Sequence, residues 1–366
     1  MQIEIRLKKV LKEHGLDRHG VTQRIADDLE IDRHTVRKFY FNRSRNPSLK
    51  VLGRICDWLL EHRVPARSLP MALFGAQASA LWPAAAAAGA VTIYLGEYQQ
   101  AMAQAHMPWI SRRDAAVEAA LVRWLSTAGV CGDTQPALGT EYVPFRVDVS
   151  AEHIRKKELD KDHAKALQMY AKIRGELSRS CAILVGSQRV NLLVEAFFAD
   201  LFGCEPFVAE SRDVRVPVFL AYKSPLGAIE SCFGGPKNPA GARKRFVKGT
   251  HYLNAAGEWV CVPSIDGKQD SGIIITSYEP DIKGLTLAVF GLSGRASEAL
   301  GHYLIQNAAP FWPPYAEKRG RKVGVYVCKI TYPPKTAGDQ GEPGNAKDVQ
   351  VVPLDAAILT QYLKSR

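Results

Sequence analysis

The chain has 366 residues, of which 46% are hydrophobic and 23% are charged, and this composition excludes a wholly disordered, collagen-like or coiled-coil protein. A length of 366 residues predicts two or three domains, because one domain commonly holds about 150 residues. The 48 lysines and arginines outnumber the 37 aspartates and glutamates, and the resulting formal charge of +11 favours a polyanionic partner.

The cysteines and the N-terminal residues favour a reducing compartment. The seven cysteines are dispersed and never spaced as CxxC, which argues against a disulfide framework and against a zinc site. The N-terminal stretch MQIEIRLKKVLKEHG lacks the apolar run and the cleavage site of a secretory signal. We therefore expect a cytoplasmic protein that holds no metal and no cofactor.

One uncharged segment, residues 71–95, is long enough to be compared with a membrane span. It consists mostly of alanine, which is far less lipophilic than leucine, and Gly75, Pro83 and Gly89 interrupt it. We expect a buried helix followed by a strand in this segment, and no contact with a membrane.

Apolar residues with helical spacing dominate the first 65 residues. They predict helices over residues 3–14, 21–30 and 33–41, and a further helix that begins at Pro47 and Ser48. The second and third helices are expected to bury Ile25, Ala26, Leu29, Val36 and Phe39. The last of these helices has an apolar stripe of Val51, Leu52, Ile55, Leu59 and Leu60. Thr22 and Asp32 stand where the second and third helices need N-caps.

Two short helices joined by a tight turn are typical of a helix-turn-helix. The close crossing of its helices requires a small residue, which Ala26 supplies. Its turn requires an apolar residue that fills the core, and Ile31 stands there. The middle of its recognition helix requires an inward side chain, which is Val36. The spacing therefore predicts a helix-turn-helix within residues 1–66.

This N-terminal segment resembles the Cro/CI-type (XRE-like) helix-turn-helix regulators. The resemblance depends on Thr22-Gln23, Ala26, Leu29, Ile31, Thr35-Val36 and Asn46-Pro47-Ser48. It covers about one sixth of the chain and implies an all-α DNA-binding bundle. The sequence departs from the family at Glu30, where glycine is common.

The distribution of charge independently supports DNA binding. No carboxylate occurs between Asp32 and Asp57, whereas seven basic residues lie within positions 33–54. Contact with phosphates requires such a surface. We assign base-edge contacts to Arg33, His34 and Arg37. We assign phosphate contacts to Gln23, Lys38, Arg43 and Arg45, while Thr35 suits either role. The alternatives are a solvated basic bundle and a helix-turn-helix that contacts protein.

After an alanine-rich linker or first buried helix at residues 67–90, short runs of valine and isoleucine alternate with helical stretches. Strands are expected at residues 91–95, 142–149, 181–186, 216–222, 259–264, 272–278, 285–291 and 322–332. Helices are expected at residues 112–126, 155–178, 191–202, 295–306 and 355–364. The alternation predicts a Rossmann-like α/β layered sheet over residues 91–366, with an antiparallel or inserted portion near residues 205–290.

Two glycine-containing turns each join a predicted strand to a predicted helix. Their candidate ligand-binding residues are Gly186, Ser187, Arg189 and Asn191 in the first turn, and Gly291, Ser293, Gly294 and Arg295 in the second. Ligands of α/β sheets bind at the carboxyl ends of strands, where helix N-termini favour anions. We expect a small anionic or nucleotide-like ligand. Neither turn matches GxGxxG or a Walker A motif, and the chain geometry of a turn alone can require a glycine.

The remaining segments and residues give weaker evidence of a binding or catalytic role. The basic stretch at residues 233–250 and the polar stretch at residues 337–346 are expected to be surface loops. GxSxG and HExxH are absent from the sequence, so no catalytic residue is assigned. Glu97, His251 and His302 remain possible neighbours of the two turns.

The sequence therefore favours a homodimeric regulator of transcription that binds double-stranded DNA and senses a small ligand through its C-terminal domain. The alternative is a nucleotide-processing enzyme, of hydrolase or glycosyl-transfer type, which a helix-turn-helix targets to its site of action. Ser187, Glu97 or His302 would then take part in the reaction. A third hypothesis is a structural nucleoid protein, which predicts DNA binding without sequence preference.

Overall fold

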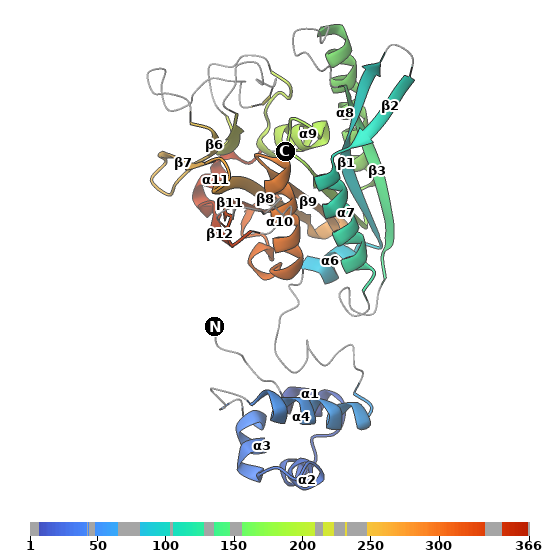
Figure 1. Cartoon of the computed structure of the whole chain (residues 1–366), viewed down its shortest axis with the longest axis vertical. Helices are drawn as coiled ribbons and strands as arrows, with labels where there is room; N and C mark the ends of the chain where they lie inside the picture. Colours follow the sequence, from blue (N-terminus) through green and yellow to red (C-terminus); the bar gives the residue numbers. More distant parts are fainter. Residues whose placement is uncertain are drawn as a thin grey trace. The chain divides into compact units, whose positions relative to one another are not determined.

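The computed structural model describes residues 7–41, 43, 48–64, 81–102, 105–127, 135–146, 156–208, 215–222, 231–232, 247–333 and 346–364. The chain divides into two compact units, Met1–Ala80 and Leu81–Arg366 (Figure 1). Residues 45, 67–80, 233–246 and 337–345, which include Arg45 and most of the two expected loops, lie outside the described residues.

The first unit consists of helices α1 (Leu7–Glu13), α2 (Val21–Asp28), α3 (Arg33–Tyr40) and α4 (Leu49–Glu61). Their apolar faces meet in one core, as the spacing of apolar residues predicts. Ile25, Ala26, Val36 and Phe39 are buried, so the inward positions expected on α2 and α3 are confirmed. Asp32 caps α3, because its carboxylate accepts a hydrogen bond from the Thr35 backbone N–H at 2.9 Å.

Two details of this unit differ from the expectation. Gly20, with a φ of 81°, precedes α2 at the N-cap position, so Thr22 lies inside the first turn and is not the cap. Leu60 is 40% exposed, because the buried stripe of α4 runs instead through Trp58. The Trp58 indole N–H also donates to the Asp28 carboxylate at 2.7 Å. Glu30 adopts a φ of 47°, a left-handed conformation that glycine adopts more readily.

The second unit is built on a nine-stranded mixed sheet of order β10-β11-β8-β9-β4-β1-β2, with β12 paired to β11 and β3 paired to β1. Its strands are β1 (Ala90–Met102), β2 (Ala105–Ile110), β3 (Ala137–Arg146), β4 (Ser180–Val185), β8 (Gln269–Glu279), β9 (Gly284–Gly291), β10 (Ala316–Lys318), β11 (Arg321–Thr331) and β12 (Asp348–Pro353). The neighbours β3, β1, β4 and β9 are parallel to one another. The remaining pairs of this sheet are antiparallel.

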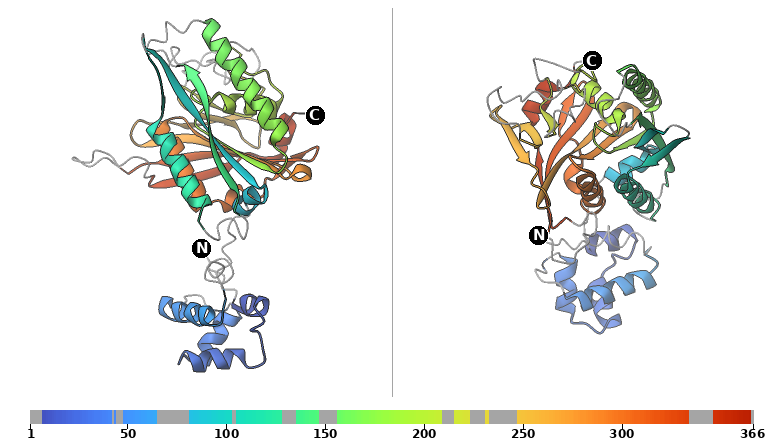
Figure 2. Two further views of the ribbon diagram at one scale, coloured as in Figure 1. Left: turned by 90° about the vertical axis from the view of Figure 1, so that its right-hand side faces the viewer. Right: turned by 45° about the horizontal axis from the view of Figure 1, so that its top comes forward.

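Helices cover both faces of this sheet (Figures 1 and 2). One apolar layer contains residues of α6 (Leu81–Ala87), α7 (Arg112–Leu125) and α10 (Gly294–Gln306). The opposite layer contains residues of α8 (Lys156–Glu176), α9 (Leu192–Phe202) and α11 (Ala356–Tyr362). Successive residues of the central strands alternate between the two layers: Ile183 belongs to the first and Leu184 to the second. Burial on both faces explains why these strands are continuously apolar.

A small antiparallel sheet of order β5-β6-β7 is formed by β5 (Val218–Ala221), β6 (Gly249–Leu253) and β7 (Trp259–Pro263). It confirms the antiparallel portion expected near residues 205–290. Two short 3-10 helices, η2 (Pro280–Ile282) and η3 (Ala309–Phe311), complete the described elements. Within the described part of the chain, no helix combines the length and the apolar character that crossing a bilayer requires.

Candidate functional site

The two glycine turns lie at the same edge of the large sheet. β4 and β9 are parallel neighbours, with Val185 opposite Val289, so both turns follow the carboxyl ends of adjacent strands. The Gly186 N–H donates to the Val289 carbonyl at 3.2 Å, which joins the start of the first turn to β9. The sequence therefore located both turns correctly, and strand pairing brings them together.

The first turn crosses directly over β1. A Cβ atom on Gly96 would lie 1.9 Å from the Val190 carbonyl oxygen, so only glycine permits this crossing. The Asn191 side-chain amide donates to the carbonyls of Tyr94 and Val185, both at 2.9 Å. Its oxygen accepts the Leu193 N–H at 3.1 Å and thereby caps α9. Asn191 thus holds the turn in place and uses both of its amide hydrogens to do so.

The other polar groups of the first turn are less fully satisfied. Arg189 is exposed, whereas Ser187 and Gln188 are buried. The Gln188 Nε2 donates to Glu195 at 2.9 Å, but its Oε1 has no hydrogen-bond partner among the described residues. The buried Tyr222 hydroxyl makes no hydrogen bond of regular geometry within this set, although the Ser187 hydroxyl lies near it. Burial raises the pKa of Tyr222 to about 12, and the polar contact with Ser187 and the charge of Arg189 lower it.

The second turn is tied to its surroundings by side chains. The Ser293 hydroxyl caps α10 through the Ala296 N–H at 3.2 Å and donates to the Asp270 carboxylate at 2.5 Å. The Arg295 guanidinium lies 3.6 Å from the ring centroid of Tyr332, a close cation–π contact. The buried Tyr332 hydroxyl again finds no partner among the described groups. Gly291 is needed for close packing against α10, whereas a Cβ on Gly294 would lie 3.0 Å from Cδ of Arg113, a side-chain atom that can shift.

Asp114, in the first turn of α7, is a site residue that the sequence analysis missed. Its side chain is buried, with 2% of the residue exposed, and its Oδ2 lies 3.6 Å from the position that a Cβ on Gly186 would occupy. No hydrogen bond or ion pair joins this carboxylate to any residue that the structure describes. Burial, together with the nearby Glu298 carboxylate, raises the pKa of Asp114 to about 6. Glu298 itself is paired with Arg113 at 2.7 Å.

An aromatic pair adjoins the first turn. Tyr98 and Trp109 face each other across β1 and β2, with ring centroids 4.1 Å apart and an interplanar angle of 7°. Tyr98 lies two residues after Gly96 and therefore on the face of β1 that the first turn crosses. Burial and the negative charge of Asp114 raise the pKa of Tyr98 to about 12, although the positive charge of Arg189 lowers it. Trp109 is 47% exposed.

We call the two turns, together with Asp114, Tyr98, Trp109, Tyr222 and Tyr332, the edge site. The other candidates from the sequence are placed differently. Glu97 does not follow a strand, because β1 continues to Met102 and pairs Glu97 with Ile110. The His251 ring is buried and stacks on Phe219 at 5.2 Å, and burial lowers its pKa. His302 is exposed in α10, eight residues beyond Gly294 and so about 12 Å along the helix.

The first unit presents a cationic surface on α3. Val36 and Phe39 face the core, whereas the side chains on the other face are exposed: Arg33, His34, Arg37 and Lys38. Thr35 is half-buried and Arg43 is exposed. Gln23 donates to Asp27 at 2.7 Å.

Phe41 was missed by the sequence analysis and lies on this same surface. It is 45% exposed, and its ring is approached by the cations of Arg43 at 5.4 Å, of Arg37 at 6.0 Å and of Lys8 at 6.0 Å. An aromatic ring among cations combines an apolar contact surface with positive charge.

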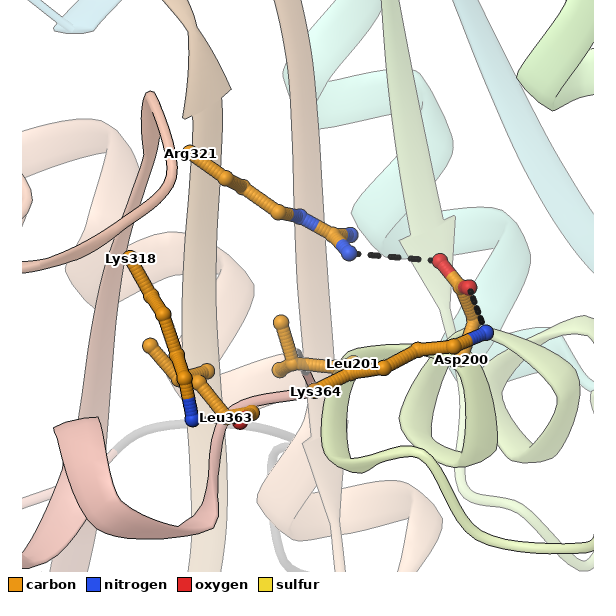
Figure 3. A pocket seen from close by; sticks show the side chains of 6 residues that line it. All are labelled: Asp200, Leu201, Lys318, Arg321, Leu363 and Lys364. Atoms are coloured by element: carbon orange, nitrogen blue, oxygen red, sulfur yellow. Dashed lines mark hydrogen bonds and ion pairs between the residues drawn. The ribbon is translucent and has the colours of Figure 1, made fainter. Parts of the chain in front are cut away.

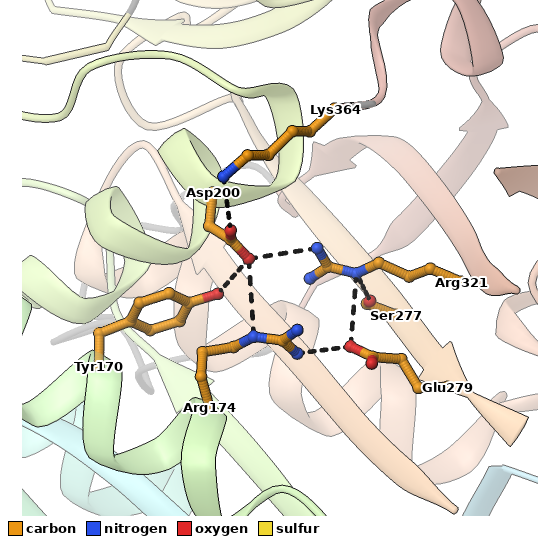
Figure 4. A network of polar contacts seen from close by, with 7 residues as sticks. All are labelled: Tyr170, Arg174, Asp200, Ser277, Glu279, Arg321 and Lys364. Atoms are coloured by element: carbon orange, nitrogen blue, oxygen red, sulfur yellow. Dashed lines mark hydrogen bonds and ion pairs between the residues drawn. The ribbon is translucent and has the colours of Figure 1, made fainter. Parts of the chain in front are cut away.

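A buried ionic network lies elsewhere in the second unit (Figure 4). Asp200 accepts hydrogen bonds from the Tyr170 hydroxyl at 2.9 Å and from Arg321 at 3.2 Å. Arg174 pairs with Glu279 at 2.5 Å, and Arg321 donates to Ser277 at 2.8 Å. Burial alone would raise the pKa of Asp200, but Arg321 and the Tyr170 hydrogen bond hold it below its ordinary value. The network joins α8, α9, β8 and β11, and its two carboxylates are both paired with arginines.

Two hollows outside the edge site give less evidence of a ligand-binding role. A cavity of about 160 Å³ is lined by Asp200, Leu201, Lys318, Arg321, Leu363 and Lys364 (Figure 3). It is smaller than the range of about 300–1,000 Å³ typical of ligand pockets. Its Lys318 ammonium donates to the carbonyls of Thr360 and Leu363, so that cation caps α11. An open hollow of about 880 Å³ is mostly apolar, and Asp355, which lines it, is the N-cap of α11.

The described residues contain no group of histidine, cysteine, aspartate and glutamate side chains that is arranged to hold a metal ion. Comparison of the chain with models of known protein families, with curated proteins and with solved structures gives no match.

Proposed function

We propose that the chain is a DNA-binding regulator whose second unit senses a small anionic, nucleotide-like ligand. In this proposal α2 and α3 form a helix-turn-helix, and α3 is the recognition helix that enters the major groove of duplex DNA. The observation that carries the proposal is the division of α3 into a buried face, with Val36 and Phe39, and an exposed face of basic side chains.

The exposed residues of α3 would have different roles in the recognition of DNA. Arg33, His34 and Arg37 would contact base edges, because residues near the start of a recognition helix reach furthest into the groove. Lys38 and Arg43 would contact phosphates, together with Gln23 and Arg45, while Thr35 suits either role. A homodimer is part of the proposal, since one module of this size buries too little surface for high specificity.

The edge site is proposed as the sensor because several of its buried polar groups have no hydrogen-bond partner among the described residues. Buried polar atoms without partners are rare in folded proteins and require an explanation. The Asp114 carboxylate, the Gln188 Oε1 and the hydroxyls of Tyr222 and Tyr332 have no hydrogen-bond partner among the described residues. A bound ligand would supply partners, and Arg189 would neutralise its anionic group. Ser187 and Arg295 would complete its polar contacts, while Asn191 and Ser293 would hold the turns that receive it.

DNA binding can be tested with a duplex selected from a random library by the full chain. We expect Arg37→Ala to weaken binding to the selected duplex by roughly 5- to 150-fold, since a base contact is worth about 1–3 kcal/mol, and to affect random duplexes less. Arg43→Ala should weaken both duplexes equally and lower the slope of log affinity against log salt by about one. Fluorescence anisotropy measures all of these changes.

Arg63→Ala is the matched control, because Arg63 is exposed in the same unit but follows α4, outside the basic segment. It should bind both duplexes like the original chain. Equal losses for Arg37→Ala and Arg63→Ala would contradict the assignment of α3 as the recognition helix.

A second candidate function is a nucleotide-processing enzyme that uses the edge site for chemistry. The observation that favours it is Asp114, whose pKa of about 6 lies close to the range in which a general acid or base is effective. Incubating the protein with nucleotides and separating the products by chromatography distinguishes the two functions. Turnover that Asp114→Asn abolishes would favour the enzyme, and recovery of unchanged nucleotide would favour the sensor.

A further inference from the structure

The outer residue of the aromatic pair is open to solvent. The rings of Tyr98 and Trp109 are nearly parallel, with an angle of 7°, and Trp109 is 47% exposed although it lies in a sheet strand. A single exposed apolar residue is ordinary on a protein surface. An exposed indole that is held by a stacked tyrosine, on the strand that the first turn crosses, is a rigid platform for a planar ring.

The groups around this platform differ in the chemistry that they recognise. Arg189 is an exposed cation on the first turn, suited to a phosphate beside the N-termini of α9 and α10. Asp114 is a buried acceptor that lies against Gly186 and has no partner among the described residues. A carboxylate repels a bare phosphate, so a simple anion satisfies Arg189 but leaves Asp114 without a donor. A ligand that satisfies both groups carries an anion and an N–H or O–H donor.

We propose that the ligand of the edge site is a nucleotide whose base stacks on Trp109, whose phosphate binds Arg189, and whose nucleoside part donates hydrogen bonds to Asp114. This inference rests on the proposed sensor function and specifies its ligand class. A purine nucleotide has the required parts: a planar base, N–H and O–H donors, and a phosphate. Asp114 is then the residue that distinguishes a nucleotide from a free phosphate or a sugar phosphate.

The test is isothermal titration calorimetry of the full chain with adenosine and guanosine 5′-monophosphate, against ribose 5-phosphate and inorganic phosphate. At least one nucleotide should bind tenfold or more tightly than ribose 5-phosphate, because base stacking on an aromatic side chain is worth roughly 5- to 150-fold. Trp109→Ala should remove most of this advantage. Asp114→Asn should weaken the nucleotide and leave ribose 5-phosphate unchanged, and Arg189→Ala should weaken both.

Two matched controls lie in the same unit. Tyr142 is a 42% exposed aromatic residue on β3, and Asp266 is a carboxylate whose side chain is 98% exposed. Tyr142→Ala and Asp266→Asn should leave nucleotide binding unchanged, and circular dichroism should show that every variant is folded.

The inference is overturned if ribose 5-phosphate binds as tightly as both nucleotides, or if Trp109→Ala binds the nucleotide normally. It is also overturned if both nucleotides bind more weakly than about 1 mM. Titration of the same preparation with duplex DNA keeps this failure separate from failure of the proposed function. A chain that binds DNA and phosphate but not nucleotides would remain a sensor of simple anions.

Discussion

At the scale of single residues, Asp114 links the edge site to the stability of the fold. Its pKa rises from an ordinary value of 3.8 to about 6, because burial disfavours the charged carboxylate and Glu298 repels it. The folded protein therefore binds this proton more tightly than the unfolded chain does. Stability due to this residue is present below about pH 4 and is lost as the pH rises to about 6.

This argument predicts that Asp114→Asn is stabilising at neutral pH. The difference between the two pKa values corresponds to at most about 3 kcal/mol, and we expect the variant to gain about 1–3 kcal/mol in free energy of unfolding at pH 7.5. At pH 4.5 the gain should largely disappear, because the original carboxyl is then mostly protonated. Urea unfolding of both chains at the two pH values measures the change. A variant that is less stable at pH 7.5 would show that the carboxylate makes a favourable contact.

The residues of the edge site differ in how far the sequence predicts them. Gly186, Ser293 and Arg295 were predicted because a glycine or a cap between a strand and a helix is a local signal. Asp114 was not predicted, because an aspartate in the first turn of a helix is common and its burial depends on distant segments. Trp109 was missed for a related reason: β2 was not expected, and without β2 the tryptophan has no known neighbour.

At the scale of elements, the extension of β1 creates the edge site. The apolar run predicts a strand over residues 91–95 only, since Gly96 and Glu97 interrupt it. In the structure β1 continues to Met102, because β2 pairs with its second half and β3 pairs along much of its length. Short or polar strands such as β10 and β12 were not predicted. They are defined by pairing with a neighbouring strand, and their sequences lack the apolar pattern of a strand.

The crossing of the first turn over β1 predicts a strong effect of Gly96→Ala. The added Cβ would meet the Val190 carbonyl, a backbone atom that cannot move without shifting the whole turn. We expect a loss of about 1–3 kcal/mol in free energy of unfolding and a loss of ligand binding, since the turn carries Arg189. Thermal unfolding and calorimetry measure the two effects.

Gly175→Ala is the control, because Gly175 lies in α8 with no atom within 4 Å of its added Cβ. This variant should be unchanged or up to about 1 kcal/mol more stable, because alanine favours a helix over glycine. An equally stable Gly96→Ala chain with intact ligand binding would show that the turn tolerates displacement.

At the scale of the whole molecule, separate cores underlie the assignment of separate roles. The apolar cluster of α1–α4 shares no residue with the two clusters that line the large sheet. Composition and periodicity suffice to predict an α-helical N-terminal part and an α/β remainder. An antiparallel portion was expected, but the strand order was beyond prediction, because it depends on contacts between residues far apart in the sequence.

If the chain is a regulator, the two binding reactions are linked in both directions. If a bound nucleotide changes the affinity of the chain for the selected duplex by some factor, the bound duplex changes the affinity of the chain for the nucleotide by the same factor. We expect a factor of roughly 5 to 150, the range typical of allosteric coupling. Anisotropy titrations of DNA with and without nucleotide, and calorimetric titrations of nucleotide with and without DNA, measure it independently. Asp114→Asn should shift the effect of the nucleotide to higher nucleotide concentrations while leaving the DNA affinity in its absence unchanged. Tight binding of both partners with a factor of one would mean that the second unit does not regulate the first, and would favour the enzyme over the sensor.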